Sequence, residues 1–132
     1  MGTKNRIFLG IINKFILHYH RNIFMSKKLF IGNKKSNKIA IDHPNQSVYI
    51  QEHNFQTLLD NSIASCKYKE NGIINFITFI DNEYLIFGIS TNNFYNELST
   101  VYKPSIRQLI KCKDTIKFFD NKYKLDFENY IN

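Results

Sequence analysis

The first 41 positions of this 132-residue chain contain no acidic residue. The first acidic residue is Asp42. The same stretch carries nine lysine and arginine residues. Residues 42–132 carry nine basic and eleven acidic side chains, so the formal net charge of +7 comes entirely from the N-terminal part. Charge placed so unevenly usually faces a polyanion, because neutralising phosphates releases condensed counterions. Basic segments without acidic residues are also typical of organelle import presequences, and both interpretations stay open.

Cysteine and glycine are scarce, which excludes several kinds of site. The five glycines are isolated and form neither a phosphate-binding loop nor a dinucleotide fingerprint. The two cysteines, Cys66 and Cys112, and the four scattered histidines lack zinc-ligand spacing. We expect two reduced thiols, and no serine lies in a nucleophile elbow. The sequence therefore predicts neither a metal nor another cofactor.

Long uncharged runs are also missing. The most apolar stretch, residues 7–24, is interrupted by Lys14, His18, His20 and Arg21. A membrane-spanning helix needs about 18 or more apolar residues in a row, so we expect no membrane span. The apolar content of 43% is ordinary for a packed globular chain. We expect a single domain over residues 1–132, with a basic segment 1–41 and a near-neutral remainder 42–132.

The N-terminal half mixes helical and strand patterns. Residues 6–22 have the period of an amphipathic helix. Short apolar runs predict strands at 29–31 and 39–41, separated by a turn over 32–37. Residues 48–50 fit a strand or a helix lead-in, and the spacing of apolar residues over 52–66 predicts a helix.

The C-terminal half is richer in strand formers. Residues 73–80 and 84–90 predict an antiparallel hairpin joined by Asp81-Asn82-Glu83. A strand or irregular edge follows over 94–102, then short β-prone runs at 106–110 and 115–119, and a helical turn or strand over 125–131. The predicted fold class is α+β: an N-terminal amphipathic helix and short strands, one further helix, then an antiparallel β-hairpin or meander.

One stretch resembles a known family. A strand at 84–87 and an apolar stretch at 97–101 lead into Lys103-Pro104-Ser105-Ile106-Arg107. This order is similar to the middle of the bacterial-type small-subunit ribosomal protein numbered eight, which carries a basic-Pro-x-x-Arg signature. Residues 37–41, then Pro44 and Ser47, and the helix 52–66 resemble that family's first strand, Pro-Ser turn and second helix. Residues 111–132 lack glycine, so the family's C-terminal Ser-Thr-Ser-x-Gly loop is absent.

The resemblance implies a non-catalytic component of an organellar small ribosomal subunit. Its partners would be ribosomal RNA and neighbouring ribosomal proteins, with no small-molecule substrate. Its location would be the mitochondrial matrix, or the cytoplasm for a bacterial chain or a parasite's nucleus-encoded chain. Lysines suit phosphates without reading sequence, and an arginine can fork onto a phosphate or stack on a base. The candidate RNA-binding residues are Lys27, Lys28, Lys34, Lys35, Lys38, Lys103 and Arg107.

Two other function classes compete with this one. A small metal-independent ribonuclease or toxin would use His43 or His53 as the base and a cation against the phosphorane charge. Alternatively, a mitochondrial complex subunit would use its basic start only as an import signal.

Overall fold

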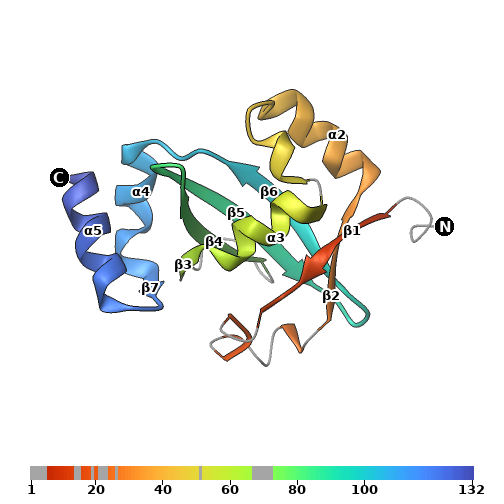
Figure 1. Cartoon of the computed structure of the whole chain (residues 1–132), viewed down its shortest axis with the longest axis horizontal. Helices are drawn as coiled ribbons and strands as arrows, with labels where there is room; N and C mark the ends of the chain where they lie inside the picture. The colour runs from red at the N-terminus through yellow and green to blue at the C-terminus, as the bar shows by residue number, and fades with distance from the viewer. Residues whose placement is uncertain are drawn as a thin grey trace.

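A computed structural model describes residues 6–13, 16–18, 20, 24–25, 27–50, 52–66 and 73–132, with the backbone alone at 52 and 53. Its seven strands form one mixed sheet in the order β1-β2-β6-β5-β4-β3-β7 (Figure 1). Helices pack on both faces of this sheet. The α+β class predicted from the sequence is therefore confirmed.

The strands pair antiparallel throughout, except that β2 runs parallel to β6. The strands are β1 (Arg6–Ile11), β2 (Lys28–Gly32), β3 (Ser62–Cys66), β4 (Ile73–Ile80), β5 (Glu83–Thr91), β6 (Asn96–Tyr102) and β7 (Ile116–Phe118). The helices are α2 (Asn33–Asp42), α3 (Glu52–Asp60), α4 (Ile106–Cys112) and α5 (Asn121–Ile131), with short 3-10 helices η2 (Ser47–Ile50) and η3 (Lys113–Thr115).

The β4–β5 hairpin forms as the sequence predicts. Its strands pair from Ile73↔Ser90 to Ile80↔Glu83. Asp81 and Asn82 connect them with φ of 54° and 62°. Positive φ at both central residues defines a type I′ turn, whose twist matches the flanking strands. Asp and Asn tolerate this backbone conformation better than other non-glycine residues.

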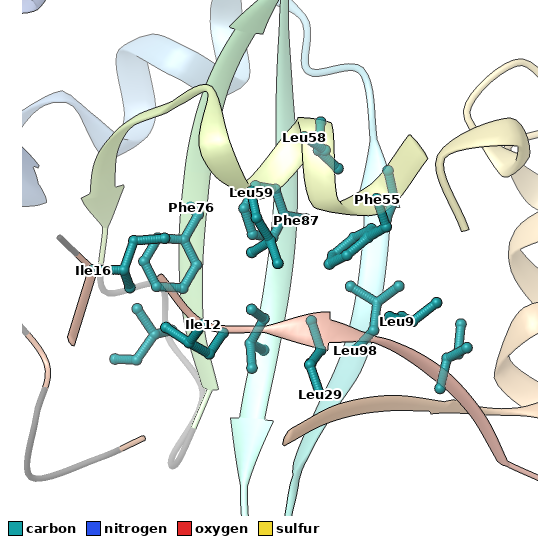
Figure 2. Packing of buried hydrophobic residues seen from close by; sticks show 14 of the residues in the cluster. Leu9, Ile12, Ile16, Leu29, Phe55, Leu58, Leu59, Phe76, Phe87 and Leu98 are labelled. Atoms are coloured by element: carbon teal, nitrogen blue, oxygen red, sulfur yellow. The ribbon is translucent and has the colours of Figure 1, made fainter. Parts of the chain in front are cut away.

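The larger core cluster lies between the sheet and α3. In β5, Leu85, Phe87 and Ile89 point into it, as the two-residue period of a strand requires. Figure 2 shows Phe55 of α3 facing this part of the sheet, close to Phe87. The ring of Phe87 is 5.5 Å from Phe55 and 5.3 Å from Phe76. The helix α3 contacts both β1 and β4, so it packs across this face of the sheet.

The smaller core cluster lies on the opposite face, under α4 and α5. Leu109 of α4 and Phe127 of α5 are buried there. Tyr84 and Ile86 of β5 meet them from the sheet, alternating with the residues that face α3. The two cysteines also lie in this cluster, both buried and both free thiols.

The predicted helix over 6–22 is wrong at its start, because residues 6–11 form β1. The register of β1 against β2 shifts between Phe8 and Gly10, and Leu9, at this bulge, is buried in the larger core cluster. Gly10 has φ of 150°, and a Cβ there would collide with the Gln56 side chain of α3. The ladder with β2 therefore overrides the helical spacing. The described residues among 16–24 are helical, so helix appears later than predicted.

Four other local predictions need correction. Residues 32–37 and 39–41, predicted as a turn and a strand, lie almost entirely in α2; Ile39 is buried but Ile41 is 79% exposed. The helix predicted over 52–66 ends at Asp60, where the chain turns into β3. Residues 106–110, predicted as β-prone, form α4. The residues matched to the ribosomal family's first strand are consequently helical.

Several other local predictions hold. The strand predicted over 94–102 is β6, and that over 115–119 is β7. Residues 48–50 form a helix lead-in, the 3-10 helix η2. Residues 125–131 belong to a helix that begins earlier, α5. The predicted "one further helix" is wrong, since α2, α3, α4 and α5 are all present.

Candidate nucleic-acid interface

A basic groove lies between α2 and β6. The parallel contact of β2 with β6 consists of two residue pairs, Leu29↔Asn96 and Phe30↔Glu97. The helix α2 starts directly after β2 and contacts both strands. The chain therefore leaves the sheet, and α2 flanks the later part of β6. The resulting groove encloses about 660 Å³ and is lined by Lys34, Lys35, Lys38, Ile39, Asp42, His43, Ser99 and Thr100.

The groove is rich in unpaired positive charge. Lys34, Lys35 and Lys38 are exposed and form no ion pair with any described residue. The first turn of α2 contains no acidic residue. Cations near a helix N-terminus meet the positive end of the helix dipole, so an anion bound there would be favourable. Asp42 contributes the single carboxylate of the groove lining.

His43 lines the groove at the C-terminal end of α2. Its backbone N–H donates to the carbonyl of Ile39 at 2.7 Å and ends α2, and Pro44 follows directly. The imidazole ring lies 6.0 Å from the ring of Tyr102 at the end of β6. Of the two histidines named for a ribonuclease, His43 thus lies beside the lysines. The side chain of His53 lies outside the described part of the structure.

Lys27 and Lys28 lie at the opposite end of β2 from the groove. The amine of Lys27 donates to the carbonyl of Asn92. Its own carbonyl accepts from the Asn96 side chain at 2.9 Å. Lys27 thus ties the start of β2 to β6 and is less available to a ligand. Lys28 is exposed, with its amine 6.0 Å from the ring of Phe8.

Lys103 and Arg107 lie apart from the groove. The Lys103 amine is 3.0 Å from Glu83 Oε1. The hydrogen bond and the charge of Glu83 raise the pKa of Lys103. Arg107 is exposed in the first turn of α4, which packs on the face opposite to α3. In Figure 1, α2 and α4 lie on opposite sides of the view.

The structure thus divides the seven sequence candidates among three places. Three lysines share the α2–β6 groove, whereas the other four candidates lie at the start of β2 and around α4. The sequence missed Ser99 and Thr100 as groove residues. Ser99 is the extra residue of a bulge, since Thr100 pairs with Gly88 and Leu98 with Ile89. Bulges often lie beside functional sites, but no local sequence signal marks this one.

Other site types find no support in the described residues. No three His, Cys, Asp or Glu side chains among them are grouped as metal ligands would be. No helix in the described part of the chain has both the length and the apolar character for crossing a bilayer.

Comparison with known proteins found no matching family model, no matching curated protein and no matching solved structure.

Proposed function

We propose that this chain is a non-catalytic RNA-binding protein whose α2–β6 groove holds backbone phosphates. The observation that carries the proposal is the gathering of Lys34, Lys35 and Lys38 in one groove without a described ion-pair partner. Lysine amines bind phosphates as point charges and read no base sequence. Ser99 and Thr100 add hydroxyl groups that can donate to phosphate oxygens.

As the biological setting we propose an organellar small ribosomal subunit, with ribosomal RNA and adjacent ribosomal proteins as partners. Two features support this setting. The acid-free segment of 41 residues suits a polyanionic environment. The Lys103-Pro104-x-x-Arg107 motif follows a strand pair, β5 and β6, as in the family that the sequence resembles.

A salt titration tests the groove. The logarithm of the binding constant for a structured RNA should fall linearly and steeply with the logarithm of the salt concentration. Each of Lys34→Gln, Lys35→Gln and Lys38→Gln should reduce the slope by about 0.9 if it removes one phosphate contact. Lys111→Gln on α4 and Lys124→Gln on α5 are matched controls, since both lysines are exposed and outside the groove. A flat slope, or equal effects in the two sets, contradicts phosphate binding in the groove.

Sedimentation of the native protein tests the setting separately. On a sucrose gradient it should travel with the small ribosomal subunit and be released by high salt. If it stays at the top while the salt titration still shows steep binding, the RNA role stands and the ribosomal setting is wrong.

A ribonuclease is the second candidate, and the position of His43 in the groove favours it. An imidazole beside three lysines could take a 2′-hydroxyl proton while the amines stabilise the charged phosphorane. Incubation with labelled RNA in EDTA distinguishes the two. A binding protein leaves the RNA intact, whereas a ribonuclease cleaves it and loses the activity in His43→Ala.

The import-segment alternative has structural features against it. Residues 6–11 supply strand β1, and Leu9, Ile12, Ile16 and Phe24 are buried in the larger core cluster. A mature protein that began beyond Met25 would lack all of them. N-terminal sequencing of the native protein tests this point directly.

A further inference from the structure

A row of aromatic rings with a cation at each end lies across β1, β2 and the start of β6. The Arg6 guanidinium is 3.9 Å from the centre of the Tyr95 ring. Tyr95 is 6.0 Å from Phe30, and Phe30 is 5.7 Å from Phe8, both edge to face. The amine of Lys28 lies 6.0 Å from the Phe8 ring centre. We call these five residues the aromatic row.

The aromatic row lies on the face of the β1–β2 hairpin that turns away from the larger core. Phe8 and Phe30 are cross-strand partners and therefore share a face. Their neighbours Leu9, Leu29 and Ile31 are buried in the larger cluster on the opposite face.

This face is only partly covered by the described residues. Phe8, Phe30 and Tyr95 are half-buried and belong to neither core cluster. Ile11, the partner of Lys28 across the hairpin, is 52% exposed. The helices α4 and α5 cover only the far part of this face, over β3, β4 and β5.

The charges around the rings favour an anionic ligand. Arg6 and Lys28 flank the row, and Glu97 is the described carboxylate nearest to it in the strand register, paired with Phe30. The Glu97 carboxylate lies beside Gly32, whose partner in β1 is Arg6, so it shares that end of the row with the guanidinium. Lys28, at the other end, forms no ion pair with a described residue. Partly exposed aromatic rings between cations are what a single-stranded nucleic acid uses, since bases stack on rings while phosphates meet the charges.

We propose that the aromatic row binds unpaired bases of single-stranded RNA by stacking. The proposal rests on the RNA-binding function proposed above and adds the class of RNA. Duplex RNA keeps its bases inside the helix, so it can engage the lysine groove but not the rings. Every base has a π-face, so the row should tolerate any base sequence.

Binding of two probes tests the proposal. The first is an oligouridine of about ten nucleotides, within the length one such surface accommodates. The second is a duplex of the same length. Phe8→Ile and Phe30→Ile keep a strand-forming side chain but remove the ring. Each should weaken oligouridine binding about 5- to 150-fold and leave duplex binding unchanged, because stacking on one ring contributes that much.

Two controls keep the test specific. Phe79→Ile removes a 37% exposed ring from the other end of the sheet and should leave both affinities unchanged. Lys38→Gln should weaken the binding of both probes. Urea unfolding of each variant verifies that it folds.

An oligonucleotide that contains the fluorescent base 2-aminopurine gives a direct readout of stacking. Its fluorescence should fall on binding to the wild type and should persist with Phe30→Ile.

The outcomes separate the two proposals. Unchanged oligouridine binding in both ring variants, with Lys38→Gln still effective, overturns the stacking proposal and leaves the groove intact. A wild type that binds neither probe overturns both. A wild type that sediments as a dimer and becomes monomeric in Phe30→Ile makes this face a protein interface, which also overturns stacking.

Discussion

At the scale of single residues, His20 combines a polar contact with an apolar setting. Its Nε2 lies 2.9 Å from the Ser65 hydroxyl. Its ring packs edge-on against Phe24 and Phe76, at 5.9 and 5.8 Å. Burial and, secondarily, the charge of Lys117 lower the pKa of His20. The folded protein therefore favours the neutral imidazole.

The His20 shift implies a dependence of stability on pH. Below the unfolded pKa of about 6.5, the unfolded chain takes up a proton that the folded chain resists, so stability falls as pH decreases until the folded pKa is passed. Urea unfolding at several pH values should show His20→Gln losing less stability than wild type over this interval. If the free energies of unfolding of the two proteins change with pH in parallel, His20 is not the group responsible.

Residue types alone identified part of the candidate site. Lys34, Lys35 and Lys38 are exposed, as a cluster of lysines without acidic neighbours suggests. Lys103 and Lys27 instead find partners in Glu83 and Asn92. These partners are distant in sequence, and the strand register that brings them close has no local signature. The sequence therefore predicts charge, but not which charges remain free.

At the scale of elements, the predictable pieces were those with strong local signals. The β4–β5 hairpin combines β-branched strands with an Asp-Asn turn, and it forms as predicted. The start of α4 also carries a local signal, which the β-prone composition of 106–110 obscured. Ser105 and Gln108 make a capping box, in which each side chain bonds the other's backbone N–H.

Loss of this cap should weaken α4. The Ser105 hydroxyl accepts from the Gln108 N–H at 3.1 Å, and Gln108 Oε1 accepts from the Ser105 N–H at 2.9 Å. Ser105→Ala should lower the free energy of unfolding by about 1 kcal/mol, as typical N-cap losses do. Ser105→Asp retains an acceptor and should stay near wild type. Chemical denaturation measures both, and equal losses would show that the hydroxyl bond is not the cause.

The elements that sequence failed to predict depend on tertiary contacts. Residues 6–11 fit a helical stripe as well as a strand, and only pairing with β2 decides between them. Ile39 and Ile41 suggest a buried strand, yet α2 buries one and exposes the other. A short uninterrupted apolar run such as Ile39-Ala40-Ile41 shows no period of its own, so its pattern cannot separate these states.

At the scale of the whole molecule, the N-terminal segment is part of the core. Leu9, Ile12, Ile16 and Phe24 are each at most 1% exposed. Burying one such side chain contributes about 1.5–3 kcal/mol. Four of them together rival the total stability of a small domain, about 5–15 kcal/mol.

Removal of this segment should therefore unfold the protein. A truncated chain that starts after Met25 should lose its cooperative thermal transition and bind a hydrophobic dye. Circular dichroism and dye fluorescence measure both effects. A truncated protein that still melts cooperatively near the wild-type temperature would mean that the segment is dispensable, and would restore the import interpretation.

The parallel contact between β2 and β6 also bears on how the chain is made. During translation, β2 emerges long before its neighbour β6, and at about 5–20 residues per second the delay lasts several seconds. Throughout that interval one edge of the nascent hairpin has no neighbour and could join the same edge of another nascent chain. Lys27, Lys28, Lys34 and Lys35 sit in and around β2. Mutual repulsion between these like charges would keep growing chains apart until β6 arrives.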